Sequence, residues 1–160
     1  MATGKEIQLT GKIGEHLVTA ELARRGIFAS PFSGNVPDID IVGYCNGKLM
    51  SFQVKAIRKT SWQFDVRKFL IIEVQHDRQV VKGINTTLDR NIICIFVKIG
   101  EELGEDEFYI FRMGWLQDYF KETYKGRISP QNINSYHCAI WLKDIQEHKD
   151  RWDIVIKNKF

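Results

Sequence analysis

The stretch PDIDIVGYCNGKLMSFQVK, from Pro37 to Lys55, decides the fold of this chain. Apolar residues alternate with others on both sides of Asn46-Gly47, a dipeptide that favours the two-residue turn of a β-hairpin. The pattern therefore predicts two antiparallel strands, one over residues 38–44 and the other over residues 49–57.

The two predicted strands carry polar residues at matching intervals. Asp38 and Asp40 are two positions apart on the first strand, and Gln53 and Lys55 are two positions apart on the second. Because successive side chains of a strand point to opposite faces, each pair shares one face of the sheet. We expect the four polar side chains to converge, supported from behind by buried apolar residues. These apolar residues are Ile39, Ile41, Phe52 and Val54.

Two interpretations of this polar face are open. Oxygen ligands beside a lysine suit metal-assisted hydrolysis of a phosphodiester, because Mg²⁺ prefers hard oxygen donors and lowers the pKa of a bound water. A neighbouring ammonium group would stabilise the negative charge that develops on the phosphate. The same four residues would also suit the solvated face of an antiparallel sheet.

The other patterns along the chain predict elements that complete a mixed sheet. Apolar residues at helical spacing predict a helix over 11–25 that ends at Gly26. The order of elements indicates an α/β (α+β) fold with a mixed central sheet. The further expected elements are a short strand at 27–30, a segment of mixed character at 61–74, a weak helix or irregular segment at 76–89, strands at 91–99 and 107–113, a helix at 114–126, and a helix followed by a strand at 139–156.

Length and composition are those of an ordinary soluble protein. At 160 residues the chain is most simply one domain spanning residues 1–160, with 44% apolar and 27% charged residues. It contains no stretch long enough for a transmembrane helix and no signal-peptide core, so we expect no membrane association and a cytoplasmic location. Cys45, Cys94 and Cys138 are odd in number and widely spread, which indicates neither a disulfide framework nor a zinc site.

The net charge of +3 is small, but the charges are unevenly distributed. Either both clusters are solvated surfaces, or a basic face beside the hairpin meets a polyanion while an acidic loop turns away from it. The basic cluster is Lys55, Arg58, Lys59, Arg67 and Lys68, and the acidic cluster is Glu101, Glu102, Glu105, Asp106 and Glu107.

Three motifs, taken in order, carry a resemblance to a known family. Gly14-Glu15 falls early in the predicted helix, Pro37-Asp38-Ile39-Asp40 starts the first strand, and Gln53-Val54-Lys55 lies on the second. This order resembles the PD-(D/E)xK nuclease superfamily, in particular archaeal Holliday-junction resolvases and small bacterial relatives. The resemblance covers residues 11–57. It implies a restriction-endonuclease-like fold, in which helices flank the mixed sheet, and hydrolysis of DNA that depends on Mg²⁺ or Mn²⁺.

Carried over residue by residue, the resemblance implies that Asp40 is the metal-binding aspartate and Lys55 the catalytic lysine. Glu15 would be the helix glutamate that completes the metal site, and Val54 would offer its backbone carbonyl to the metal. Gln53 departs from the family pattern, which has Glu or Asp at this position. Its amide oxygen can bind Mg²⁺ and would belong to the same catalytic group, but it lacks the negative charge. An inactive nucleic-acid-binding module is therefore the alternative to an active nuclease, and a toxin or effector nuclease would share the chemistry.

The substrate is less defined than the chemistry. Asp38 either orients the substrate or is an exposed residue at the strand start, and Trp62, Phe64 and Phe69 either pack in the core, which their spacing favours, or stack on unpaired bases. DNA is the expected partner, with RNA as an alternative, and branched, site-specific and nicked substrates all stay open. We expect a homodimer, because cutting two strands requires two sites. The basic residues expected to contact phosphates are Arg58, Lys59, Arg67 and Lys68.

Overall fold

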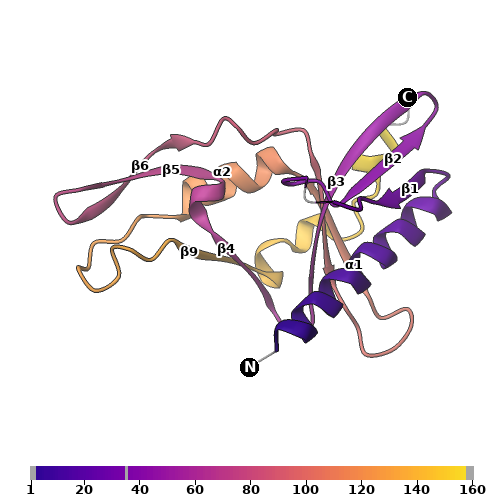
Figure 1. Ribbon diagram of the computed structural model, residues 1–160, viewed down its shortest axis with the longest axis horizontal. Coiled ribbons are helices and arrows are strands. Elements are labelled where there is room, and N and C mark those ends of the chain that lie inside the picture. Colours follow the sequence, from indigo (N-terminus) through magenta and orange to yellow (C-terminus); the bar gives the residue numbers. More distant parts are fainter. Residues whose placement is uncertain (1–2, 35, 158–160) are drawn as a thin grey trace.

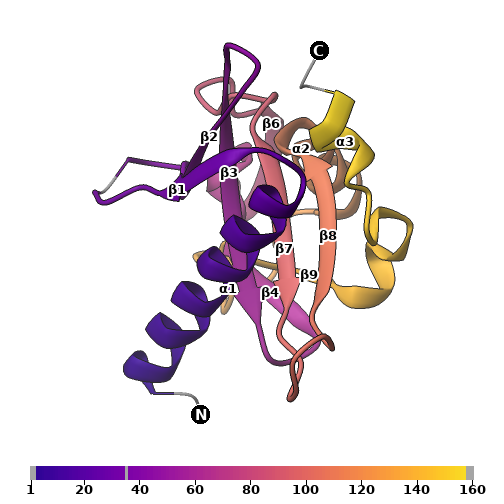
Figure 2. The same ribbon diagram turned by 90° about the vertical axis from the view of Figure 1, so that its right-hand side faces the viewer.

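The chain folds around a five-stranded sheet with the strand order β1-β2-β3-β7-β8 (Figure 1, Figure 2). The computed structural model describes residues 3–34 and 36–157. Only β3 and β7 are parallel, and the other neighbouring strands are antiparallel, so the central sheet is mixed as predicted. The strands span Phe28–Pro31 (β1), Ile41–Cys45 (β2), Lys48–Ile57 (β3), Ile93–Lys98 (β7) and Glu107–Arg112 (β8).

The predicted hairpin is confirmed as β2 and β3. Asn46 and Gly47 form its turn with φ angles of 50° and 79°, the left-handed values that a two-residue hairpin turn requires. However, β2 begins at Ile41, because the left-handed φ of 68° at Asp38 interrupts the extended backbone before it. The expectation that Asp38 and Asp40 share one face of a strand is therefore wrong, since both precede β2.

The helix α1 (Gly4–Arg24) covers one face of the sheet. It begins well before the predicted start at residue 11, because Thr3 and Glu6 form a capping box at its N-terminus. In this box the side chain of each residue accepts a hydrogen bond from the backbone N–H of the other.

The helix approaches β3 most closely at one glycine. A Cβ atom at Gly14 would lie 2.5 Å from the Cβ of Ala56, so glycine is required for this contact. Figure 2 shows α1 crossing in front of β3. Phe52 and Val54 of β3 are buried beneath the helix, as the alternation of side chains predicted.

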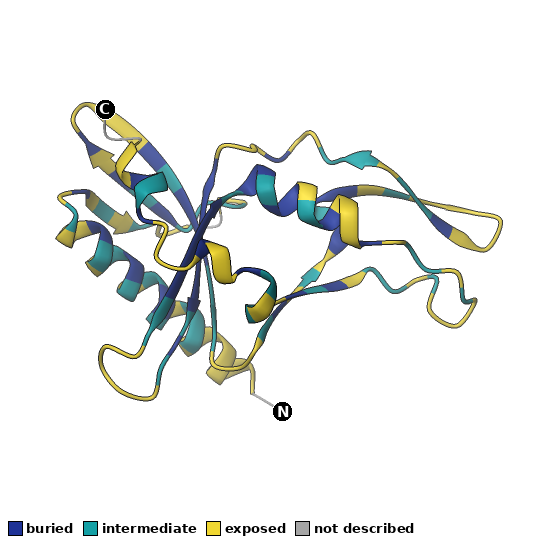
Figure 3. Ribbon diagram, turned by 180° about the vertical axis from the view of Figure 1, so that it is seen from behind, coloured by how far each residue is buried: buried dark blue, intermediate teal, exposed yellow. Residues whose placement is uncertain are grey.

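The opposite face of the sheet is covered by α2 (Met113–Thr123) and by two small sheets. One pairs β4 (Ser61–Asp65) with β9 (His137–Trp141), and the other is the hairpin of β5 (Leu70–Gln75) and β6 (Arg78–Ile84). The far end of this hairpin extends away from the central sheet (Figure 1) and is largely exposed, whereas the central strands are mostly buried (Figure 3). The remaining helices are α3 (Asp153–Ile156) and three 3₁₀ helices at Val66–Lys68, Leu142–Asp144 and Gln146–His148.

Aromatic rings form much of the core on this second face. Trp62 and Phe69 are fully or almost fully buried, and Phe64 is half-buried with its ring stacked on Phe96 at 5.8 Å between centroids. Core packing of these aromatic residues, the arrangement favoured by their spacing, is confirmed.

The segment 76–89 was predicted as a weak helix or an irregular segment. This is wrong for its first half, which forms a turn and β6 of the β5–β6 hairpin, whereas residues 85–89 are irregular as predicted. His76 and Asp77 make the two-residue turn with φ angles of 47° and 60°. Two consecutive left-handed residues without glycine are uncommon, so the local pattern did not indicate a hairpin.

The C-terminal segment 139–156 was predicted as a helix followed by a strand, and this order is wrong. The strand β9 comes first and is followed by the short helix α3. β9 forms its ladder with β4, which lies far away in the sequence, so local periodicity carried no signal for it.

Several other expectations can be compared with the structure directly. The hairpin of β7 and β8 and the helix α2 lie where the pattern predicted them, within a few residues. The segment 61–74 holds β4 and part of β5, separated by a 3₁₀ helix. Cys45, Cys94 and Cys138 are all free and buried. Within residues 3–34 and 36–157, no helix is long and apolar enough to cross a membrane.

Candidate active site

The candidate site lies where β2 and β3 diverge, which we call the fork. The backbone N–H of Asp40 donates to the carbonyl oxygen of Phe52 at 2.9 Å, and Oδ2 of Asp40 accepts from the N–H of Val54 at 2.8 Å. The N–H and C=O of one residue in a strand point to the same side, so the Val54 carbonyl is directed toward the edge of β3 that Asp40 occupies. The fork therefore brings two of the predicted metal donors to one edge.

Gln53 lies beside the fork on the face of β3 away from α1. Its side chain is only 3% exposed. Its Nε2 donates to Oδ1 of Asp38, and its Oε1 accepts from Nζ of Lys68, both at 3.4 Å. The Asp38 and Lys68 side chains also pair directly, with 2.5 Å between Nζ and Oδ1. This triangle satisfies both ends of the buried amide, which would otherwise be costly to bury.

Lys55 follows Gln53 on the same face and is half-buried. Its backbone carbonyl accepts a hydrogen bond from Nε1 of Trp62 at 3.0 Å, which ties β4 to this end of β3. The arrangement of Gln53 and Lys55 on one face, with Val54 on the other, agrees with the predicted alternation.

Cys94 of β7 is buried and pairs with Gln53 across the β3–β7 ladder. Burial raises the pKa of the Cys94 thiol to about 12, so the thiol stays neutral. Among the smaller influences on this pKa, Lys68 and Lys55 lower it, whereas Asp38 and Asp40 raise it. Two ammonium groups and two carboxylates thus influence the pKa of this one thiol.

Glu15 lies on α1 directly after Gly14, the residue at which the helix contacts Ala56 of β3. Its Oε2 lies 2.7 Å from Nζ of Lys12, and its side chain is 16% exposed. The pKa of Lys12 is raised, first by the hydrogen bond to Glu15 and by the charge of Glu15, and also by the charge of Asp40. The charge of Asp40 therefore acts on the same ammonium group that pairs with Glu15.

Two lysines, Lys12 and Lys68, pair with carboxylates near the fork, and neither pairing was predicted from the sequence. Lys12 stands three positions before Glu15, a spacing at which oppositely charged helix residues pair, so the sequence held a signal for that contact. The pairing of Lys68 with Asp38 had no such signal, because the two residues are distant in sequence and come together only through the packing of β5 and its preceding 3₁₀ helix near the fork.

The other predicted substrate residues differ in their surroundings. Arg58 and Lys59 are exposed at the end of β3, directly beyond Lys55. Arg67 is engaged elsewhere, because its guanidinium pairs with Asp65 at 2.5 Å and lies 4.2 Å from the centroid of the Tyr136 ring. Arg58 and Lys59 are thus better placed than Arg67 to meet a phosphate near the fork.

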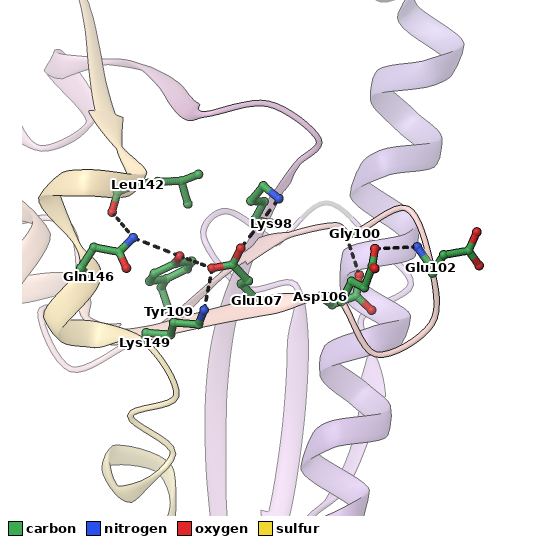
Figure 4. Close-up of polar contacts among 10 residues, drawn as sticks. Lys98, Gly100, Glu102, Asp106, Glu107, Tyr109, Leu142, Gln146 and Lys149 are labelled. Atoms are coloured by element: carbon green, nitrogen blue, oxygen red, sulfur yellow. Dashed lines mark hydrogen bonds and ion pairs between the residues drawn. The ribbon is translucent and has the colours of Figure 1, made fainter.

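The acidic cluster is largely satisfied within its own neighbourhood (Figure 4). Oδ1 of Asp106 accepts from the N–H of Gly100 at 3.0 Å, which closes the loop between β7 and β8. Oε2 of Glu107 accepts hydrogen bonds from Nζ of Lys149 at 2.8 Å and from the hydroxyl of Tyr109 at 2.7 Å, and these contacts lower the pKa of Glu107. These acids therefore serve local structure and do not extend the fork.

The donors at the fork fit a hard divalent cation. Among the described residues, no group of three or more His, Cys, Asp or Glu side chains has the geometry of a metal site. The donors are instead a mixture, with the carboxylates of Asp40 and Glu15, the Gln53 amide oxygen and the Val54 carbonyl. Mg²⁺ is commonly held by one or two carboxylates and keeps several waters, so this oxygen set suits it. Zn²⁺, which favours Cys and His, has no matching donors here.

The solved structures that resemble this chain include two nucleases, whereas no protein-family model and no curated protein sequence matches the chain. The bacterial homing endonuclease I-Ssp6803I aligns with a TM-score of 0.54 at 16% identity, over 94% of this chain and 93% of that one. Hjc, a Holliday junction resolvase from the archaeal hyperthermophile Archaeoglobus fulgidus, aligns with a TM-score of 0.51 at 14% identity, over 94% and 97% of the two chains. The chain has a restriction-endonuclease-like fold. This restriction-endonuclease-like fold, with its mixed sheet between flanking helices, is the one that the three motifs predicted.

Proposed function

We propose that this chain is a divalent-metal-dependent endonuclease that hydrolyses phosphodiester bonds of DNA. The observation that carries the proposal is the fork itself, where the Asp40 carboxylate accepts a hydrogen bond from the N–H of Val54, the residue between Gln53 and Lys55 on β3. The likeness of the fold to a homing endonuclease and to a Holliday junction resolvase supports the same chemistry.

Each residue of the fork has a distinct role in this proposal. Asp40, Gln53 and the Val54 carbonyl would hold Mg²⁺ or Mn²⁺, with Glu15 completing the site. A cation held there would supply a water of lowered pKa and would neutralise charge on the phosphate. The Val54 N–H keeps the Asp40 carboxylate in position through one oxygen, and the ammonium group of Lys55 stabilises charge that develops on the phosphate.

Contacts outside the fork would hold the DNA. Arg58 and Lys59 are exposed beyond Lys55 and would contact phosphates of the same strand, so binding would weaken as salt is added. Asp38 and Lys68 would act as positioning residues, because their ion pair holds the amide of Gln53 from both ends. The homodimer, the single domain and the cytoplasmic location stay predictions. Sedimentation velocity would measure the oligomeric state and so test the homodimer.

A DNA-binding module without nuclease activity is the second candidate function. Gln53 favours it, since both polar ends of its side chain are already engaged by Asp38 and Lys68. An amide in this position also removes one negative charge that would attract the cation.

A cleavage assay distinguishes the two candidates. We expect the wild-type protein to cut labelled DNA with Mg²⁺ or Mn²⁺, and Asp40→Asn and Lys55→Ala to lose about 100-fold or more in rate, the size of a lost charge-stabilising group. Both variants would keep most of their DNA affinity. Asp89→Asn and Lys121→Ala change exposed residues away from the fork and serve as matched controls. Cleavage by both fork variants at the wild-type rate would refute the fork as the active site, and wild-type protein that binds DNA without cutting it would favour the binding module.

A further inference from the structure

A groove of about 780 Å³ runs beside the C-terminal half of β3, between the N-terminal half of α1 and β4. Lys55 is one of its lining residues, so the groove adjoins the fork at this residue. Two apolar residues of α1 that line it are unusually open to water, since Ile7 is 63% exposed and Leu9 is 53% exposed. The apolar residues that line the groove are Ile7, Leu9, Ile13, Ala56, Ile57, Trp62 and Phe64.

The groove combines this apolar surface with positive charge. Lys55, Arg58 and Lys59 line its β3 side. Among the described residues that line it, Glu6 is the one carboxylate, and its side chain is occupied by the capping hydrogen bond from the N–H of Thr3 at 2.5 Å. A ligand that fits must therefore present a broad apolar face together with negative charge.

A nucleotide has this combination of properties. Its base offers a flat apolar face, and phosphates flank it on both sides. Apolar side chains such as Ile7 and Leu9 can hold a base that has left its stack, while basic side chains follow the backbone. Because Lys55 belongs both to the fork and to the groove, a base in the groove would sit next to the phosphodiester at the fork.

We propose that the groove binds one unpaired nucleotide beside the bond that is cut, an inference that rests on the proposed nuclease function. A base within a continuous duplex would have to leave its partner and its stacked neighbours before it entered the groove, which costs free energy. A base that is already unpaired, at a flap, a bulge or a branch, enters without that cost. The chain therefore selects DNA that carries an unpaired nucleotide over an unbroken duplex.

Binding measured without any divalent metal tests the inference apart from cleavage. The probes are two labelled DNAs of the same sequence, a continuous duplex and the same duplex with one unpaired 2-aminopurine nucleotide. We expect the wild-type protein to bind the second DNA at least about 5-fold more tightly and to change the 2-aminopurine fluorescence, as stacking on one base predicts.

Variants of the exposed groove residues report on the site. Ile7→Gln with Leu9→Gln removes apolar surface from the groove, and because glutamine is a good helix former and both positions are exposed, α1 is kept. We expect the ratio of the two affinities to fall close to 1. The matched control combines Leu49→Gln with Ile128→Gln, which are 75% and 76% exposed outside the groove, and it should keep the wild-type ratio.

Each other outcome has a definite meaning. If the wild-type protein binds both DNAs equally, or if the groove variant keeps the wild-type ratio of affinities, the nucleotide site is overturned. The proposed nuclease activity is then still tested by the cleavage assay. A preference for the unpaired nucleotide without cleavage of any DNA overturns the nuclease and keeps the site. If the wild-type protein is a dimer that dissociates in the groove variant, while the ratio of the two DNA affinities stays unchanged, the groove holds a second copy of the chain. This result would also overturn the nucleotide site.

Discussion

The close approach of α1 to β3 predicts opposite effects of one substitution at two glycines of the same helix. A Cβ atom at Gly14 would lie 2.5 Å from the Cβ of Ala56, whereas a Cβ at Gly11 would meet no atom within 4 Å. Both glycines lie inside α1. We therefore expect Gly11→Ala to stabilise the protein and Gly14→Ala to destabilise it.

The magnitude follows from two contributions. Replacing glycine with alanine inside a helix gains about 1 kcal/mol, and this gain applies at both positions. Overpacking costs about 1–3 kcal/mol, and the upper part of this range applies at Gly14, because the Cβ of Ala56 is fixed to the β3 backbone and cannot rotate away. The free energy of unfolding should rise by about 1 kcal/mol in Gly11→Ala and fall by about 1–2 kcal/mol in Gly14→Ala.

Urea unfolding measures both changes through the midpoint and the slope of the transition. A double variant, Gly14→Ala with Ala56→Gly, serves as the control for the clash. The next nearest atom to the new Cβ is then Cγ1 of Val54 at 3.5 Å, an ordinary contact. We expect the double variant to regain most of the loss, less about 0.5–1 kcal/mol for glycine within a strand.

Two results would refute this reasoning. If Gly14→Ala stabilised the protein as much as Gly11→Ala, α1 could not pack on β3 at this distance. If Gly11→Ala had no effect, the helix would begin near residue 11 and the capping box at Thr3 would not form. Because Glu15 follows Gly14, a displaced helix would also move a proposed metal ligand, so cleavage by Gly14→Ala should fall along with stability.

The remaining two predictions concern the metal and the pH. Gln53→Glu restores a negative charge at the fork, so calorimetry in the presence of DNA should show tighter Mg²⁺ binding than in the wild type, and unchanged or weaker binding would place the amide outside the metal site. His148 is buried with no hydrogen-bond partner for either ring nitrogen among the described residues, and burial lowers its pKa despite the opposing charge of Glu147. Because the unfolded chain then binds the proton more readily, the stability is full above about pH 6.5 and is lost as the pH falls below it. In His148→Phe the difference in urea midpoint between pH 7.5 and pH 5 should shrink, and an undiminished difference would assign it to other groups.

The sequence by itself determined the hairpin of β2 and β3 and the division of its side chains. Asn46-Gly47 favours left-handed backbone angles, and alternation along a strand follows from local geometry, so Phe52 and Val54 had to face away from Gln53. The capping box of Thr3 and Glu6 was equally local, and its spacing was present in the sequence even though the predicted helix began later.

Only the tertiary structure decided which distant groups meet. The ion pair of Asp38 with Lys68 and the pairing of β9 with β4 both join segments far apart in the sequence. The groove beside the fork likewise exists because α1 and β4 pack on opposite sides of one strand edge. Steric preferences act between neighbouring residues and can be read from periodicity. The choice of a packing or ion-pair partner depends on burial over the whole chain, which no local pattern records.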